Sequence, residues 1–363
     1  MEYIAYIVIV FTTIQIIVAG INFACKQNMK TASKKEELVS ILIPARNEAK
    51  NIHNILRDLS TQEYHNYEVL VFDDDSTDHT AEIVTAFMQK NNKIRLITSK
   101  ELPNGWLGKN RACHSLAMEA KGSYFLFLDA DVRIKGNIIS KTVNFAHKHG
   151  LSLLSVFPKQ IIKSGNEYAT VPIINYILLT LLPLILVRKT ANPSLAAANG
   201  QYMCFEAKNY MQFLPHQVMK AEKVEDIKIA RYYKKNKQKI ACLANEKEIK
   251  CRMYSSYSEA VNGFAKNVTT FFGGSTLLTI LFWLITTIGF IPILLVFGTK
   301  GLAAYLVCIL FIRILVSLTS NQSVTANIIY LMPQQISLGA IILKSIINRL
   351  KKEQLWKERN IIQ

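Results

Sequence analysis

The sequence predicts an α/β domain built on a parallel sheet, with apolar helices at both ends of the chain that hold it at a membrane. Two observations lead to this prediction. Between residues 38 and 150, short apolar runs alternate with segments of helical spacing, which is typical of a parallel sheet covered by helices. The chain is also 50% hydrophobic and only 19% charged, an apolar excess over ordinary soluble domains that indicates membrane-embedded segments.

Cysteine content and charge limit the function classes. The six cysteines among 363 residues form no CxxC pair, which excludes a disulfide-stapled scaffold, a zinc ribbon and a CxxC redox site. The net charge of +17 is compatible with nucleic acid, an anionic membrane surface or a phosphate-bearing substrate. We expect no nucleic-acid partner, because the chain lacks a basic platform with interleaved aromatic residues.

The N-terminal segment is expected to be an uncleaved transmembrane anchor, residues 1–25. Its apolar run, residues 4–23, is long enough to cross the hydrocarbon core. Lysines follow this run instead of preceding it, the reverse of a signal peptide. The positive-inside rule then places the chain after Lys26 in the cytoplasm. We therefore expect a multi-pass protein of the cytoplasmic membrane with its α/β domain inside the cell.

Four apolar runs of the central region are expected to be strands, and helical segments follow the first three. The expected strands are residues 38–44, 67–72, 93–98 and 124–128. The expected helices are residues 47–59, 76–88 and 111–120. Ligands of such sheets bind at the carboxyl ends of the strands, and three polar clusters fall at those ends.

The cluster after the second expected strand is a run of three carboxylates, residues 73–75. Ser76 can cap the following helix, and Asp78 can interact with its dipole. Asp73 and Asp74 are not needed for capping. They can accept hydrogen bonds from a nucleotide base or a ribose hydroxyl, as the acidic residue of dinucleotide folds does.

The other two clusters follow the first and fourth expected strands. Residues 44–48 precede a helix whose N-terminus can bind an anion, although Asn47 can equally be a simple helix cap. Asp129 and Asp131 leave a strand on the same side, so both carboxylates can reach one hard cation. Mg²⁺ or Mn²⁺ held in this way completes its coordination with substrate phosphate.

Missing motifs narrow the chemistry further. The sequence has no GxGxxG after a strand, no P-loop and no GxSxG elbow. A nucleotide held through carboxylates and a metal, without a P-loop, indicates a nucleotide-sugar.

Several spaced motifs resemble one known family, the inverting family-two glycosyltransferases with the GT-A fold. The strongest are VSILIPARNEAKNI (39–52), VLVFDDDSTDHT (69–80) and LFLDADV (126–132). The likeness continues through residues 104–112, 198–205, 224–231, 252–254 and 356–359. The combination is most similar to the membrane-anchored branch that contains carotenoid glucosyltransferases of the diaponeurosporenoate and hydroxychlorobactene type. The resemblance implies a GT-A catalytic domain at residues 36–270.

The resemblance also implies roles for individual residues. A UDP-sugar donor would be bound by Pro44, Ala45, Glu48, Asp73, Asp74, Lys109 and Asp129. Asp129 and Asp131 would hold Mg²⁺ or Mn²⁺ beside the diphosphate, and Asp226 would be the catalytic base.

Two departures from the family pattern bear on function. Asp75 stands where the family usually has Gly or Asn. The QxxRW motif of processive polysaccharide synthases is absent, and residues 252–254 (RMY) occupy roughly its place. This second departure favours a single transfer over polymer synthesis.

The C-terminal part predicts a transmembrane hairpin, residues 275–320, followed by a basic cytoplasmic tail, residues 321–363. The two apolar spans, 277–297 and 302–318, are joined by the turn at 298–301. Arg313 lies near the inner end of the second span and is expected to extend to the interface. Residues 336–347 are too short to span and are expected to lie along the membrane surface.

The apolar segment at residues 172–188 is constrained by the proposed chemistry. A metal site at Asp131 and a base at Asp226 must meet on one substrate, so the chain cannot cross the membrane once between them. We expect this segment to be interfacial or re-entrant, with a buried core helix as the alternative.

Together these observations predict a membrane-bound inverting hexosyltransferase. It would move a sugar, expected to be glucose, from a UDP-sugar to a hydrophobic acceptor such as a carotenoid. Transfer onto polyprenyl phosphate or a glycerolipid is the alternative activity. A membrane scaffold with a degenerate nucleotide fold is the non-enzymatic alternative.

Overall fold

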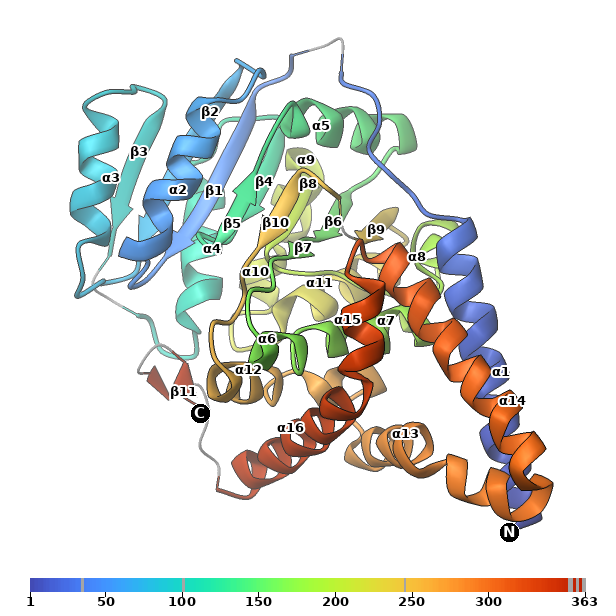
Figure 1. The fold of residues 1–363 in the computed structure, drawn as a ribbon. Coiled ribbons are helices and arrows are strands. Elements are labelled where there is room, and N and C mark those ends of the chain that lie inside the picture. The colour runs from blue at the N-terminus through green and yellow to red at the C-terminus, as the bar shows by residue number, and fades with distance from the viewer. Residues whose placement is uncertain (34–35, 100–101, 245, 352–354, 357–358, 361–363) are drawn as a thin grey trace.

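The structure is a computed structural model that describes residues 1–33, 36–99, 102–244, 246–351, 355–356 and 359–360. An α/β domain lies on one side, and the N-terminal helix and the C-terminal helices gather on the other (Figure 1). Parts of the predicted tail, residues 352–354, 357–358 and 361–363, lie outside the described residues, as does part of the matching segment 356–359.

A seven-stranded sheet has the order β3-β2-β1-β4-β8-β6-β9. Its strands are β1 (Val39–Ala45), β2 (Tyr67–Asp73), β3 (Ile94–Thr98), β4 (Tyr124–Leu128), β6 (Leu153–Phe157), β8 (Tyr202–Glu206) and β9 (Ile240–Ala244). The four expected strands are confirmed as β1 to β4, which pair in parallel. A purely parallel sheet is wrong, because β8 runs antiparallel to both β4 and β6.

A second, three-stranded sheet has the order β5-β10-β7. Its strands are β5 (Val132–Ile134), β7 (Lys159–Gln160) and β10 (Ile249–Cys251), and a separate pair is formed by β11 (Leu355–Trp356) and β12 (Arg359–Asn360). β5 follows Asp131 directly, and Cys251 of β10 pairs with Val132. The small sheet therefore fixes the chain just after the expected metal site.

Helices cover both faces of the large sheet. They are α2 (Ala49–Ser60), α3 (Thr80–Met88), α4 (Gly108–Glu119), α5 (Ile138–His149), α6 (Gly165–Tyr168), η1 (Pro193–Leu195), α9 (Ala207–Phe213), α10 (Pro215–Val218), α11 (Glu225–Lys235), α12 (Tyr257–Phe264) and η2 (Val268–Phe272). The strands are buried on both sides: Ile41 and Ile43 join one core with α2 and α5, whereas Leu42 joins the other with α4 and α11. This explains why the strands read as nearly continuous apolar runs.

The described residues contain two helical stretches apolar and long enough to cross a membrane, Glu2–Ala24 and Thr276–Thr319. The first is α1; the second comprises α13 (Thr276–Ile288) and α14 (Phe290–Thr319), and α15 (Val324–Ile329) and α16 (Leu331–Lys351) follow. Non-helical backbone at Gly298 interrupts α14 where the turn is expected. Beside this bend, Phe297 packs on Tyr6 with ring centroids 5.9 Å apart.

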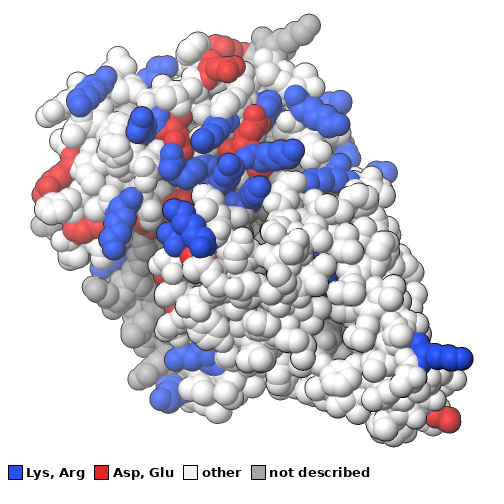
Figure 2. Space-filling model, viewed as in Figure 1, with Lys and Arg blue, Asp and Glu red and all other residues white. Residues whose placement is uncertain are grey.

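The helix α1 has an inverted polarity pattern. Its buried side chains include Thr12, Gln15 and Asn22, while its exposed side chains are mostly large and apolar: Tyr3, Ile4, Tyr6, Ile7, Ile9, Val10, Ile14, Ile17 and Phe23. Water-soluble helices have the opposite arrangement. Figure 2 shows Lys and Arg gathered over the α/β domain, whereas the surface of the helical part carries little charge before its far end.

The apolar segment 172–188 forms two helices, α7 (Pro172–Leu181) and α8 (Leu184–Lys189). Most of α7 is buried, as in the core-helix alternative. Asn22 of α1 bridges the break between the two helices: its Nδ2 donates to the carbonyls of Leu179 and Leu182, both at 2.9 Å, and its Oδ1 accepts from the Leu184 amide at 2.7 Å.

Arg313 does not extend to the interface, so that expectation is wrong. The residue is only 3% exposed. Its guanidinium donates to Gln334 Oε1 at 2.6 Å and lies 3.8 Å from the centre of the Tyr176 ring. A hydrogen bond and a cation–π contact inside the helix bundle therefore stabilise the guanidinium away from the interface.

Candidate active site

The three polar clusters meet at one edge of the large sheet. Ala45, at the end of β1, is in register with Asp73, at the end of β2, and Pro44 is in register with Phe72. β4 pairs with the other side of β1, so Asp129 follows at the same edge. This edge holds the carboxyl ends of the parallel strands, where ligands of such sheets bind.

Asp73 has a carboxylate oxygen available for a ligand. Its Oδ2 accepts from the Ser76 amide at 3.3 Å, whereas its buried Oδ1 has no hydrogen-bond partner in the described part of the chain. Buried oxygens are normally paired. Asp74 instead supports the loop, because its amide donates to the Ala45 carbonyl at 2.9 Å and its carbonyl accepts from Arg46.

The two loops at this edge are fastened to each other, and the expected helix caps are wrong. Asn47 has a left-handed backbone (φ 51°) and precedes the true cap position of α2, which is Glu48. The Asn47 amide donates to Ser76 Oγ at 2.9 Å, and Asn47 Oδ1 accepts from the Thr77 amide at 2.9 Å. Asn47 and Ser76 therefore hold the loops together instead of capping α2 and α3.

Asp75 also has a left-handed backbone, with φ of 57°. Gly and Asn adopt this conformation most readily, and Asp tolerates it as well. The family preference for Gly or Asn at this position therefore has a backbone cause, and the carboxylate of Asp75 is compatible with the turn.

Lys109 links two carboxylates that are far apart in sequence. It lies in the first turn of α4, and its Nζ is 2.9 Å from Asp129 Oδ1 and 3.4 Å from Glu225 Oε1. Burial by itself lowers the pKa of Lys109, but the charges of Asp129 and Glu225 raise the pKa well above its usual value. A permanent positive charge is thus held beside Asp129.

Asp131 is the more buried carboxylate of the DxD pair. Its Oδ2 accepts from Cys251 Sγ at 3.3 Å and from Gln201 Nε2 at 3.5 Å, while its buried Oδ1 has no partner among the described residues. Burial, followed by the charge of Asp129, raises the pKa of Asp131 to about 7, and the charge of Glu48 adds to the effect.

The DxD pair has the donor chemistry for Mg²⁺ or Mn²⁺. An unpaired buried oxygen and two mutually repelling carboxylates are stabilised by a hard divalent cation. The described residues contain no cluster of three or more His, Cys, Asp or Glu that could enclose a metal. Asp129 and Asp131 would therefore hold the ion as a pair, with the remaining positions open to a diphosphate and water.

Asp226 lies next to the Lys109 cluster. Its Oδ2 accepts from the Gly200 amide at 3.0 Å, and its Oδ1 accepts from the Ile227 amide at 2.8 Å. A Cβ at Gly200 would lie 3.2 Å from Lys109 Nζ and 3.7 Å from Asp226 Cβ. A side chain at this position would crowd both groups. Asp226, the expected base, and Lys109, the expected donor contact, therefore both lie against Gly200.

Burial raises the pKa of Asp226 to about 7, and the neighbouring charge of Glu225 contributes to the increase. A carboxylate with this pKa can accept a proton near neutral pH.

Comparisons with known proteins identify the family of the central segment. Residues 40–205 match the family described as Glycosyl transferase family 2. This segment is a glycosyltransferase family 2 domain.

The 4,4'-diaponeurosporenoate glycosyltransferase of Staphylococcus haemolyticus (strain JCSC1435) is 30% identical over 141 residues, which are 38% of this chain and 36% of that protein. The enzyme of the same description from Staphylococcus aureus (strain N315) is 28% identical over 171 residues, which are 46% of this chain and 44% of that protein. The chain thus spans less than half the length of these curated relatives.

A solved structure extends the likeness beyond the family 2 domain. The mannosyltransferase PcManGT from Pyrobaculum calidifontis, in complex with GDP-Man and Mn2+, covers 95% of this chain and 99% of its own, with a TM-score of 0.53 and 14% identity. At this identity the likeness concerns the fold, which is GT-A.

The glycosyltransferase fold gathers the predicted residues around one edge of the sheet and adds three that the sequence analysis did not single out. These are Gly200, Gln201 and Glu225. Gly200 and Gln201 lie in the segment ANGQYMCF, and Glu225 precedes the expected base in VED. Both segments are among those that resemble the family, so their neighbourhood was the signal available in the sequence. Their contacts depend on β8 and α11 meeting β4 and α4, which no local pattern reveals.

Proposed function

We propose that this glycosyltransferase is a membrane-bound, inverting hexosyltransferase that moves a sugar from a UDP-sugar to a hydrophobic acceptor. One observation carries the proposal. Asp226, whose pKa is raised, and Lys109 both lie against Gly200, and Lys109 forms an ion pair with Asp129 of the DxD motif. A proton acceptor thus stands beside the groups suited to a donor diphosphate.

The donor side supplies binding and charge stabilisation. The unpaired Asp73 Oδ1 can accept from the nucleotide, and Asp129 and Asp131 would hold the metal. Such a metal supplies Lewis-acid stabilisation of a departing diphosphate. Lys109 adds a fixed positive charge on the same side. The choice of uridine rests on the family resemblance, since the mannosyltransferase of similar fold is described with GDP-Man.

The acceptor side supplies the base. Asp226 removes the proton of the attacking hydroxyl as its oxygen approaches the anomeric carbon. The bond between the anomeric carbon and the diphosphate oxygen breaks on the opposite face, so the configuration inverts. The Gly200 and Ile227 amides hold both oxygens of Asp226 and orient it for this transfer.

The membrane assignment is supported by the inverted polarity of α1 and by the two apolar helical stretches. A carotenoid-like acceptor is supported by the description of two relatives as diaponeurosporenoate glycosyltransferases. We propose that the α/β domain faces the cytoplasm, where nucleotide-sugars are made. Polyprenyl phosphate and glycerolipids are the alternative acceptors.

Replacing the proposed base tests this function. Asp226→Asn is expected to lower kcat by roughly 10²–10⁴-fold, because the amide cannot accept the proton, while UDP binding is retained. Turnover is measured as glucose transferred from UDP-glucose in membranes of an expressing host, with products identified by mass spectrometry. The matched control is Glu63→Gln, which likewise replaces a carboxylate by an amide, but at an exposed residue.

The control variant is expected to keep wild-type turnover. Equal turnover of Asp226→Asn and the wild type would contradict the assigned base. A wild-type chain that neither binds UDP nor consumes UDP-glucose would favour the scaffold alternative.

A further inference from the structure

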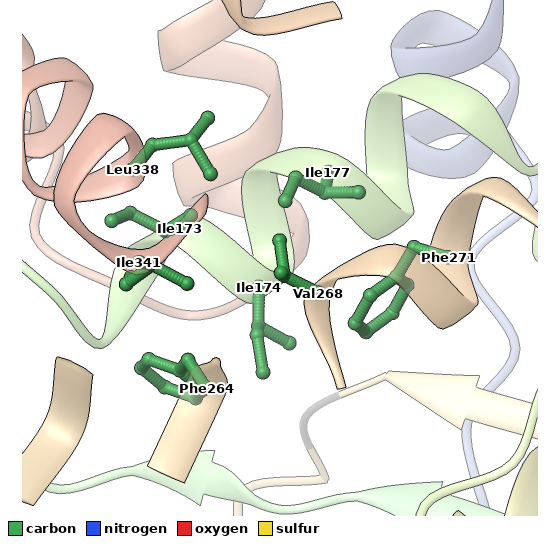
Figure 3. A pocket seen from close by; sticks show the side chains of 8 residues that line it. All are labelled: Ile173, Ile174, Ile177, Phe264, Val268, Phe271, Leu338 and Ile341. Carbon is green, nitrogen blue, oxygen red and sulfur yellow. The ribbon is translucent and has the colours of Figure 1, made fainter. Parts of the chain in front are cut away.

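The cavity between α7, α12, η2 and α16 is not suited to a charged ligand. All the side chains that line it are apolar, among them Ile173, Phe264 and Leu338 (Figure 3). At the carboxyl edge of the sheet, in contrast, buried oxygens lack partners. Asp131 Oδ1 and Gln201 Oε1 are two of them in the described part of the chain. Since buried polar atoms are normally paired, this edge is where a bound cation would be stabilised.

Gln201 contacts both aspartates of the DxD pair. Its carbonyl accepts from the Asp129 amide at 3.2 Å, and its Nε2 donates to Asp131 Oδ2 at 3.5 Å. The Gln201 amide in turn donates to Asn199 Oδ1 at 2.9 Å, which fixes its own backbone. Gln201 is buried, so water competes little for these bonds. One side chain just before β8 is therefore tied to the backbone of Asp129 and to the carboxylate of Asp131.

Cys251 completes a ring of hydrogen bonds with Gln201 and Asp131. Its Sγ accepts from Gln201 Nε2 at 2.9 Å and donates to Asp131 Oδ2 at 3.3 Å. Cys251 is fully buried, and β10 holds its backbone in register with Val132, the residue after Asp131. The thiol is thus held in place from the small sheet, next to the carboxylate that it contacts.

This ring engages one oxygen of Asp131 and leaves the other available. Oδ2 has two donors, whereas Oδ1 has no partner among the described residues. A carboxylate oxygen accepts about two hydrogen bonds, so a cation would find free lone pairs at Oδ1. Asp129 is restricted as well, because Lys109 Nζ lies 2.9 Å from its Oδ1 and 3.1 Å from its Oδ2.

We propose that Gln201 and Cys251 are positioning residues, which make Asp131 bind the divalent cation through Oδ1 alone and thereby select Mg²⁺ or Mn²⁺ against Ca²⁺. The inference rests on the proposed function, because the cation would serve the donor diphosphate. Ca²⁺ takes about six to eight oxygen ligands and often uses both oxygens of a carboxylate. Mg²⁺ is smaller and demands octahedral coordination, to which a carboxylate with one free oxygen is better suited.

Mn²⁺ binding to the full-length protein in detergent, with UDP present, tests the positioning role without measuring turnover. Free Mn²⁺ is followed by its electron paramagnetic resonance signal. Cys251→Ala and Gln201→Met each remove a donor to Asp131 and should raise Kd for Mn²⁺ by roughly 10- to 100-fold, the usual effect of losing a group that orients a metal ligand. Cys251→Ser keeps a hydroxyl donor and should recover most of the affinity.

Competition with Ca²⁺ tests the selectivity in the same measurement. In the wild type, Ca²⁺ should displace Mn²⁺ poorly. Freeing Asp131 Oδ2 in Cys251→Ala or Gln201→Met should lower the ratio of Kd for Ca²⁺ to Kd for Mn²⁺ by at least about 10-fold. A merely structural role of the two residues would weaken the binding of both ions equally.

Cys204→Ala is the matched control, because it removes another buried thiol, on β8 and in register with Leu126. Its Kd values for both ions should equal those of the wild type. The affinity for UDP in the presence of EDTA should be the same in all these proteins. Gln201→Met lies outside the strands and keeps the test decisive if Cys251→Ala folds poorly.

A wild-type Kd for Mn²⁺ in either Cys251→Ala or Gln201→Met would overturn the inference, and so would an unchanged ratio for the two ions. Loss of Mn²⁺ binding in Cys251→Ser as complete as in Cys251→Ala would also overturn it, since the sulfur would then be a ligand itself. Wild-type protein that transfers sugar from UDP-glucose in EDTA would overturn the inference and leave the transferase function standing. Wild-type protein that does not bind UDP would overturn the proposed function as well.

Discussion

At the scale of the residue, the site depends on carboxylates whose charges are controlled by their neighbours. Asp129 is paired with Lys109, whereas burial raises the pKa values of Asp131 and Asp226 to about 7. Two acids of one type thus have different environments within one site. Asp129 keeps a fixed counter-charge, and Asp226 can exchange a proton near neutral pH.

The raised pKa of Asp226 predicts the pH dependence of turnover. A base must be ionised, so kcat is expected to rise with pH through about 7 and to fall away below that value. Burial is the main cause of the increase, and the charge of Glu225 is the second. Glu225→Gln removes that charge and should move the acid limb of the kcat profile to lower pH. A Glu222→Gln control, which changes a partly exposed carboxylate, should leave the limb unmoved, and an identical limb in all three proteins would contradict the assignment.

At the scale of the element, the sequence predicted β1 to β4 and their helices because local patterns determine these elements. The ends of β1, β2 and β4 were accurate for the same reason, because each is marked by a change from apolar residues to Pro-Ala or Asp. β8 was not predicted as a strand, and the hydrogen bond between Cys251 and Asp131 was not foreseen. Both depend on strands that are distant in sequence, and their pairing is decided by packing.

The polar contacts of α1 give a prediction about stability. Asn22 satisfies two carbonyls and one amide at the break between α7 and α8, in surroundings that are otherwise apolar. Asn22→Leu would leave these groups unpaired, at a cost of about 2 kcal/mol or more. We expect a Tm lower by several degrees in detergent, measured by differential scanning fluorimetry. Thr13→Leu, on the exposed side of the same helix, should leave the Tm nearly unchanged, and equal Tm values for both variants would refute the structural role of Asn22.

At the scale of the whole molecule, one apolar core joins the helical part to the catalytic domain. Ala19 of α1, Phe282 of α13 and Ile312 of α14 belong to the same buried cluster as Phe127 of β4. The apolar helices at both ends of the chain are therefore packed into the core of the α/β domain.

The arrangement of α1 and α14 also predicts the topology. The start of α1 meets the bend of α14 through Tyr6 and Phe297, and the residues after both helices meet again where Lys26 Nζ donates to Asn321 Oδ1 at 3.4 Å. The bend should therefore lie on the same side of the membrane as the N-terminus, and the α/β domain on the other. With the lysines after α1 inside, the bend is outside.

Reporter fusions in a bacterial host test this topology. Alkaline phosphatase inserted after Thr299 is expected to be active, because the enzyme folds only outside the cytoplasm. Green fluorescent protein fused after Gln363 is expected to fluoresce. This protein folds in the cytoplasm, but it does not become fluorescent after export through the general secretion pathway. The reverse pattern would place the nucleotide site outside the cell, away from the supply of nucleotide-sugars. An active phosphatase after Thr299 together with no fluorescence after Gln363 would mean that α16 crosses the membrane instead of lying along its surface.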